Sequence, residues 1–517
     1  MSENKLLQNK RIVKNAFFLS VRMLLAMLVS LYTSRVILEA LGVENFGIYN
    51  VIGGVISLFA FVNGAMSNAT QRYIAFELGK GVETEVKRVF SACMMIHIFI
   101  ALSIFTLAET LGLYILNHYL TIPETELPAA NWVYQISILS CMIMVINSPY
   151  NGAIVAYERM QAFAYISLIE VFLRLGVAFL IVYLPGDKLI VYALLLFAVQ
   201  LLIRLSYTIY CRRKLVNVRF YLLWDRELFK RLSGFMGWTM FNNMSIIACS
   251  QGVNILLNIF FNPVVNAARG IAVQVESAVN MFSRNFQTAV SPQIIKSYSM
   301  GENGHFLRLI FSASRLSFFL LLLLAFPVLM HIDYILQLWL KEPPAYTADF
   351  VRIVICISLV NVLSEPLLAG VSACGVIKYF QMVSGLLFVG ILPVSALGFR
   401  FIHMPIFVFE VYLAIAVAVY AYKLYYCKRH IALPLKAYFC QVLLKVGSVS
   451  VFCVAFYIFL YRNRTYKEFG QFLYSFLISS LIVCIVIYIF GLNENERSKF
   501  ICYLKKLPAL KAAFRKK

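Results

Sequence analysis

Continuous apolar runs, each about 20 residues long and repeated along most of the chain, constrain the fold more than any other feature of the sequence. An α-helix needs this length to cross the hydrocarbon core of a bilayer. The strands of a membrane β-barrel would instead show short segments of alternating polarity. Only 14% of the 517 residues are charged, whereas 61% are apolar. A water-soluble chain of this length would need more polar surface, so we predict an all-α polytopic membrane protein.

The apolar runs predict fourteen transmembrane helices. They cover 15–38, 46–66, 89–116, 132–155, 162–184, 189–211, 234–259, 264–290, 308–330, 349–374, 378–400, 405–427, 437–460 and 470–491. The spans 46–66 and 264–290 are the richest in polar or small residues. No small-residue cleavage site follows the first apolar run, so we interpret that run as a membrane helix and not as a signal peptide.

Basic residues predict the orientation of the spans. The chain has 46 Lys and Arg against 24 Asp and Glu, a net charge of +22. In a membrane protein this excess belongs mainly to cytoplasmic loops, and we expect no nucleic-acid partner. Basic clusters at 72–88, 212–231 and 497–517 place both termini in the cytoplasm. The loop near 462–467 is basic although this orientation places it outside, which departs from the rule.

An internal repeat divides the chain at an offset of about 216–220 residues. Ser148-Pro149-Tyr150-Asn151-Gly152 matches the segment from Ser364 to Gly370, and Ala156 matches Ala373. Six spans separate the two copies, so both have the same orientation and form a parallel repeat around a central cleft. The predicted organisation is a six-helix lobe at 1–211, a second at 212–430, two additional helices at 431–492 and a basic cytoplasmic tail at 493–517.

Charged and amide side chains inside the spans are the candidate site residues, because such groups at membrane depth need a partner or water. The substrate-binding candidates are Arg22, Arg35, Arg174, Arg269, Asn280, Arg284 and Arg315. The ion-coupling candidates are Glu170, Glu276 and Glu365, of which Glu365 has no arginine nearby in the sequence. Two simpler interpretations remain open: Glu170 and Arg174 can pair as i, i+4 neighbours, and Arg22 and Arg315 can extend toward the membrane surface.

The span 264–290 carries the longest polar stripe. Arg269, Glu276, Asn280 and Arg284 lie within one arc of the helix, and the span 234–259 has a shorter stripe that includes Ser250 and Asn254. Such stripes line either a hydrated cleft or a tight polar contact between helices. Arginines outnumber carboxylates in the spans, so a cleft would be cationic. The planar guanidinium group is well suited to phosphate.

Sequence signatures of catalysis and metal binding are missing. The chain has no GxxxxGK[ST] loop, no DxD pair and no HExxH motif, and its eleven cysteines include no CxxC pair. We therefore predict no enzymatic activity, no catalytic residue, no metal and no cofactor.

The segment 33–49, Thr-Ser-Arg-Val-Ile-Leu-Glu-Ala-Leu-Gly-Val-Glu-Asn-Phe-Gly-Ile-Tyr, resembles the start of polysaccharide transporters. In those proteins a leucine-glycine turn precedes a Phe-Gly-x-Tyr motif that opens the second helix. The Ser-Pro and Ser-Glu-Pro segments in the fourth and tenth spans and the arrangement of twelve helices plus two also fit. The chain thus resembles the polysaccharide transporter (Wzx-like) family of the MOP flippase superfamily.

This resemblance implies two six-helix lobes around a cavity and transport by alternating access. It also implies a bacterial inner-membrane location and a substrate, an undecaprenyl-pyrophosphate-linked oligosaccharide carried from the cytoplasmic to the periplasmic leaflet. Arg22, Arg35, Arg269 and Arg284 would then contact the pyrophosphate. Expected partners are this lipid-linked oligosaccharide, membrane lipid and other membrane proteins of glycan assembly. A cation- or proton-coupled exporter of the MATE type is the alternative.

Overall fold

The computed structural model describes residues 60–118, 125–215, 217–261, 263–461, 469–494 and 496–498, with further residues scattered between Arg22 and Tyr49. This part of the chain is almost entirely helical and contains no β-strand, which confirms the predicted all-α class. The predicted spans 15–38 and 46–66 lie largely outside the described residues, and so does Arg35.

The described helices follow one another with short connections. In the first half of the chain they are α2 (Ala60–Lys80), α3 (Glu83–Leu107), η1 (Ala108–Gly112), α4 (Leu113–His118), α5 (Leu127–Ala156), α6 (Met160–Tyr183), α7 (Lys188–Lys214) and α8 (Arg226–Phe260). In the second half they are α9 (Pro263–Ser299), α10 (Asn303–Met330), α11 (Ile332–Leu340), α12 (Thr347–Cys374), α13 (Lys378–Gly398), α14 (Phe407–His430), α15 (Leu435–Tyr438), η2 (Phe439–Leu443), α16 (Leu444–Tyr461), α17 (Phe469–Val486) and η3 (Ile487–Gly491).

Eleven helical segments of the described residues are long and apolar enough to cross a membrane, and each coincides with a predicted span. The protein is therefore a multi-pass membrane protein. The eighth predicted span is also a helix, α9, but it is not among those eleven. Its 37 residues extend over about 55 Å at 1.5 Å per residue, which is longer than the hydrocarbon core. The polar stripe explains why hydropathy alone does not detect it.

The helix of the second predicted span, 46–66, continues further along the chain than the sequence predicts. Residues up to Lys80 belong to α2, whereas the sequence predicted a loop after residue 66. The apolar run stops there, but the helix continues as a mixed polar and apolar segment. Arg72, which the sequence predicts in that loop, therefore lies on a helix and is buried.

Two compact units are formed by the described chain. The first comprises residues 1–248, 288–306 and 369–386, and the second comprises 249–287, 307–368 and 387–517. The borders between the units fall within α8, α9, α10, α12 and α13. The predicted lobe limits at residues 211 and 430 follow the chain order instead, and they remain a prediction.

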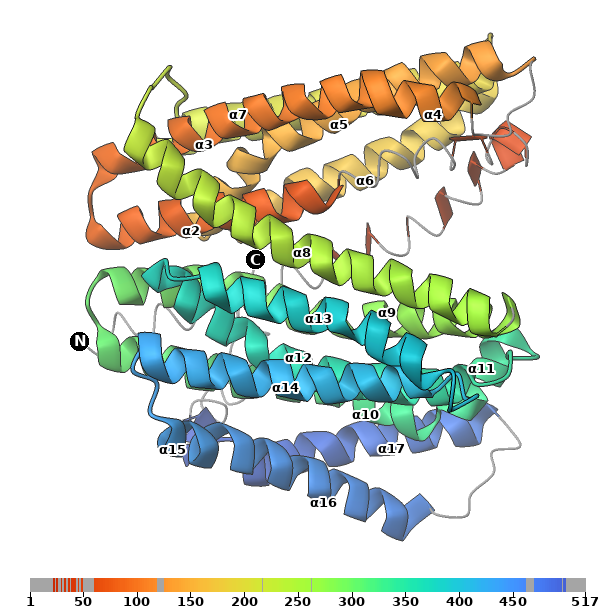
Figure 1. Cartoon of the computed structure of the whole chain (residues 1–517), viewed down its shortest axis with the longest axis vertical. Helices are drawn as coiled ribbons and strands as arrows, with labels where there is room; N and C mark the ends of the chain where they lie inside the picture. The colour runs from red at the N-terminus through yellow and green to blue at the C-terminus, as the bar shows by residue number, and fades with distance from the viewer. Residues whose placement is uncertain are drawn as a thin grey trace, which may run out of the picture. The chain divides into compact units, whose positions relative to one another are not determined.

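In the first unit, α5 is the central helix and packs against α2, α3 and α7 (Figure 1). Gly152 allows the close approach of α5 to α2, since a Cβ atom there would lie 2.9 Å from the carbonyl oxygen of Ser67. The connection between α7 and α8 lies against α3, where the amide nitrogen of Asn217 donates to Glu83 at 2.8 Å. At its end, Asp225 accepts from the backbone N–H of Leu228, and this hydrogen bond lowers the pKa of Asp225.

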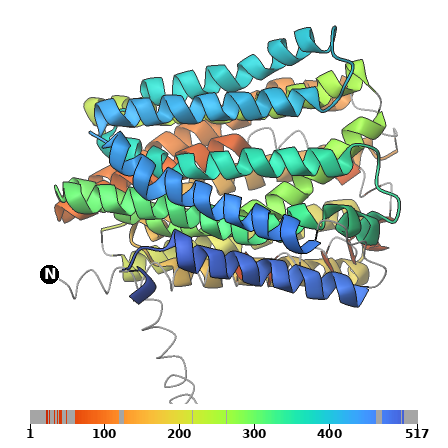
Figure 2. The same cartoon turned by 90° about the horizontal axis from the view of Figure 1, so that it is seen from below.

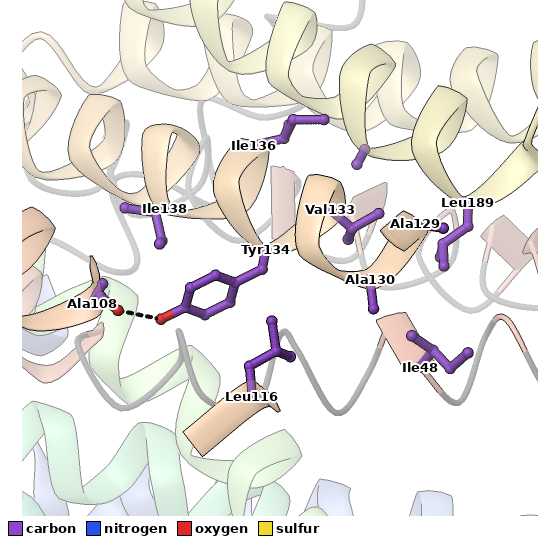
Figure 3. Packing of buried hydrophobic residues seen from close by; sticks show 11 residues of the cluster. Ile48, Ala108, Leu116, Ala129, Ala130, Val133, Tyr134, Ile136, Ile138 and Leu189 are labelled. Atoms are coloured by element: carbon purple, nitrogen blue, oxygen red, sulfur yellow. Dashed lines mark hydrogen bonds between the residues drawn. The ribbon is translucent and has the colours of Figure 1, made fainter. Parts of the chain in front are cut away.

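A π-helical turn, η1, interrupts the helix that begins with α3. The hydroxyl of Tyr134 donates to the carbonyl oxygen of Ala108 at 2.8 Å, and Figure 3 shows this bond inside a cluster that includes Leu116 and Val133. Gly112 leaves room for the tyrosine, because a Cβ atom there would lie 2.0 Å from its hydroxyl. The hydroxyl of Tyr134 thus has a hydrogen-bond acceptor at the bulge, although it lies in an apolar core.

In the second unit, α16 and α17 pack side by side at the end of the described chain (Figure 2). These are the two additional helices predicted outside the repeat. Arg315 of α10 connects to this region: its guanidinium binds the carbonyl oxygen of Gln441 at 3.0 Å and a carboxylate oxygen of Glu496 at 2.5 Å.

Candidate functional site

The polar stripe of α9 begins at Arg269, which is 7% exposed. Its guanidinium donates to the carbonyl and hydroxyl oxygens of Ser250 at 2.8 and 3.0 Å and to the side-chain oxygen of Asn254. The polar stripes predicted on the seventh and eighth spans therefore meet, and at this level the polar helix contact is the observed arrangement. All of these acceptors are neutral, so they orient the arginine without cancelling its charge.

Glu276 lies two turns further along α9 and contacts α12. One of its carboxylate oxygens accepts hydrogen bonds from the hydroxyl of Ser358 at 2.9 Å and from the amide of Asn280 at 3.1 Å. The same amide also reaches the Ser358 oxygen at 2.9 Å. The donors are again neutral, and the positive charges of Arg269 and Arg284 act on the carboxylate. The predicted coupling residue Glu276 and the predicted binding residue Asn280 thus form one polar cluster.

Arg284 is the exposed member of the same stripe. It lies eight residues after Glu276, which is about two helical turns. An arginine in a membrane helix is costly in contact with lipid, and the positive charge of Arg284 acts on Glu276 of the same stripe. One turn further on, Gln287 donates to the carbonyl oxygen of Val362 at 3.2 Å, which again joins α9 to α12.

The candidate residues of the first unit differ in the groups that they contact. Glu170 and Arg174 form the i, i+4 ion pair that the sequence suggested, with a separation of 2.7 Å. Arg22 is half-buried; its guanidinium reaches the hydroxyl of Ser167 at 3.5 Å and lies 4.9 Å from the centre of the Phe163 ring. Arg22 is thus held by neutral groups, whereas Arg174 is neutralised by its neighbour.

Arg315 has the surroundings of a structural residue. Its side chain is 1% exposed, and it forms an ion pair with Glu496. Its side chain is therefore buried in a contact with a residue that follows the last membrane helix. The sequence could not indicate this partner, because Glu496 lies beyond the last predicted span.

Sequence reasoning missed Lys423 on α14. Its charge interacts with Glu365 of α12, so Glu365 does have a cation near it. Lys423 lies within the predicted span 405–427 but was not among the candidates. Because Lys423 lies near Glu365, Glu365 is no longer the carboxylate with the fewest charged neighbours. Glu276, which accepts hydrogen bonds from neutral donors only, takes its place as the first coupling candidate.

Metal-binding groups of three or more His, Cys, Asp or Glu residues are absent from the described part of the chain. The ten cysteines described there are free thiols.

Comparison with known proteins identifies the family. The family model described as polysaccharide biosynthesis protein matches residues 12–301, which is more than half of the chain. The chain belongs to this family. No curated protein sequence matches it.

Solved structures with the same fold are transporters of the MOP superfamily. An outward-facing multidrug resistance MATE transporter is 12% identical, with 82% of this chain and 96% of that chain covered and a TM-score of 0.71. A MOP superfamily transporter from Pyrococcus furiosus is 13% identical, with 82% and 96% covered and a TM-score of 0.69. The MATE transporter ClbM is 15% identical, with 80% and 94% covered and a TM-score of 0.65. This polysaccharide biosynthesis family member thus has the predicted MOP fold.

Proposed function

We propose that the protein is a flippase for an undecaprenyl-pyrophosphate-linked oligosaccharide, the repeat unit of an O-antigen, capsule or exopolysaccharide. It would carry this lipid from the cytoplasmic to the periplasmic leaflet of the bacterial inner membrane by alternating access. Family membership supports a role in polysaccharide biosynthesis, and the fold is that of membrane transporters. The distribution of basic residues supports cytoplasmic termini.

The polar stripe of α9 carries the proposal. Arg284 is exposed on a helix of the transport fold, and Arg269 keeps its charge because its partners are neutral. The two arginines are 15 residues apart along α9, or about 22 Å at 1.5 Å per residue. They would offer the pyrophosphate a cation at two depths of its passage, with direct contact at Arg284. In the first unit, Arg22 is the matching candidate, because it too is held by a neutral oxygen and a ring.

Glu276 is the carboxylate that we assign to coupling. It is bound by neutral donors, so it has no direct ionic partner that fixes its charge. Glu170 is paired with Arg174, and Glu365 has Lys423 near it. A proton or a cation bound at Glu276 would be sensed by Arg269 and Arg284 through their shared electrostatic interaction with this carboxylate.

The alternative, a cation- or proton-coupled exporter of small molecules, is favoured by one observation: the solved structures that share the fold include MATE transporters. The fold alone does not distinguish the two cargoes. A large anionic lipid headgroup would use the α9 arginines, whereas a small cation would use the carboxylates.

Deleting the gene in its native host tests the proposal. We expect surface polysaccharide to be lost and the lipid-linked repeat unit to accumulate in the inner leaflet of the inner membrane, with unchanged sensitivity to cationic drugs. Restoring the gene should reverse both changes. Normal surface polysaccharide together with raised sensitivity to cationic drugs would instead support the exporter.

A further inference from the structure

The ends of α2 and α9 are equivalent positions of the two repeats. Both helices are followed by a glycine with a φ of +75°, Gly81 after α2 and Gly301 after α9. Gly79 and Ser299 each precede this glycine by two residues, and they touch: a Cβ atom on Gly79 would lie 1.7 Å from the hydroxyl oxygen of Ser299. Equivalent residues of the two repeats therefore meet at this crossing.

The turns that follow α5 and α12 are equivalent as well. Each contains a residue with positive φ, Glu158 at 59° after α5 and Gly375 at 80° after α12. The sequence match of Ala156 to Ala373 places both residues at the same position of the repeat. A left-handed backbone conformation is costly for glutamate. Glu158 nevertheless adopts this conformation in the turn after α5.

The first contact, which we name the first latch, joins α2 to the turn after α12. The guanidinium of Arg72 donates to the carbonyl oxygens of Ser372 and Ala373 at 2.7 and 2.9 Å. These carbonyls belong to the last turn of α12, at the negative end of the helix dipole. The arginine is 7% exposed and lies 4.2 Å from the centre of the Tyr73 ring. The first latch is therefore a buried contact made by a positively charged side chain.

The second contact, the second latch, joins α9 to the turn after α5. The ammonium group of Lys296 lies 2.7 Å from a carboxylate oxygen of Glu158, and the two side chains are 20% and 9% exposed. The amide of Gln293 donates to the other carboxylate oxygen at 3.3 Å. In each latch a cation on the second helix of one repeat holds the turn after the fourth helix of the other repeat.

We propose that the two latches act together as a gate, which holds the repeats together on this face and opens to admit substrate from it. The basic clusters of the sequence assign this face to the cytoplasm. The inference rests on the proposed transport function, because a gate requires a chain that opens alternately on two faces. The crossing of α2 and α9 is the pivot about which both latches separate. All of these residues lie in the first unit.

Cys374 is a native probe of the gate. It is the last residue of α12, it is partly buried, and its thiol is hydrogen-bonded to the hydroxyl of Tyr298. Opening of the first latch exposes this thiol to water. Breaking the second latch exposes it only if the two latches are coupled, because Glu158 lies on the other turn.

The experiment measures the rate at which a membrane-impermeant maleimide modifies Cys374 in the purified protein, with Cys374→Ala giving the background of the other thiols. Glu158→Lys and Lys296→Glu should each raise the rate about tenfold, the effect expected for loss of one charged contact. The double exchange, Glu158→Lys with Lys296→Glu, should restore the slow rate. Arg72→Gln is the positive control, with Arg72→Lys in its place if that variant does not fold.

A rate unchanged in both folded single variants would overturn the gate, and so would a double exchange that stays fast. The measurement needs no substrate, so it is independent of the proposed cargo. The single variants could label fast while the gene deletion keeps its surface polysaccharide. That pair of results would support the gate and reject the flippase.

Discussion

Two neighbouring helices, α9 and α10, carry arginines in contrasting surroundings. Arg315 on α10 is 1% exposed and neutralised by Glu496 at 2.5 Å. On α9, Arg269 binds neutral oxygens of α8, and Arg284 is exposed. An arginine already paired with a carboxylate has no net charge to offer a ligand, whereas an arginine oriented by neutral groups retains it. The contrast teaches that the partner of a membrane arginine indicates its role better than its depth in a span.

The largest effect is expected from breaking the ion pair of α10. Arg315→Ala leaves the carboxylate of Glu496 without its partner and should destabilise the protein by about 3–5 kcal/mol. We expect low abundance in the membrane and a lower melting temperature in detergent. The double variant Arg315→Leu with Glu496→Leu should recover much of this loss, since replacing both members of a buried pair by apolar residues is often neutral. A stable, abundant Arg315→Ala protein would show that Arg315 is not a structural residue, and would contradict its contrast with the arginines of α9.

An intermediate effect is expected at the carboxylate of α9. Glu276→Gln keeps the oxygen that accepts from Ser358 and Asn280, so stability should change by less than about 1 kcal/mol. The charge is lost, however, and transport driven by an imposed pH gradient should no longer respond to that gradient. Glu365→Gln and Glu170→Gln are the matched controls, each of which removes a charge outside this cluster. Unchanged pH dependence in all three variants would reject proton coupling through these residues.

The smallest effect is expected at the ion pair of α6. Arg174 and Glu170 have side chains that are 44% and 25% exposed, and pairs at accessible positions contribute about 0–1 kcal/mol. The double variant Glu170→Gln with Arg174→Gln should therefore accumulate and transport within about twofold of the unmodified protein. Loss of glycan delivery at normal protein abundance would show that this pair also serves the substrate.

Most of the fold was predictable because bilayer thickness and helical geometry act locally. Apolar runs located eleven spans, and the 100° helical repeat predicted a polar stripe on each of the two helices that carry Arg269, Ser250 and Asn254. The partners of charged residues were not predictable, because they depend on contacts far apart in the chain. Glu496 is 181 residues from Arg315, and the carbonyls that bind Arg72 are 300 and 301 residues from it. Arg72 was also obscured by the end of an apolar run, which marks where hydropathy falls and not where the helix stops.

The most direct test of the flippase proposal is the rate at which the purified protein, in sealed vesicles, moves an undecaprenyl-pyrophosphate-linked oligosaccharide with a fluorescent sugar across the bilayer. An impermeant quencher reports the labelled sugars that remain outside. We expect Arg284→Ala to fold normally and to slow this movement about 10- to 100-fold, the range for losing a hydrogen bond to a charged group. Arg284→Lys should recover only part of the rate, because an ammonium keeps the charge but lacks the bidentate fork. Equal rates for the unmodified protein and a folded Arg284→Ala variant would contradict the account.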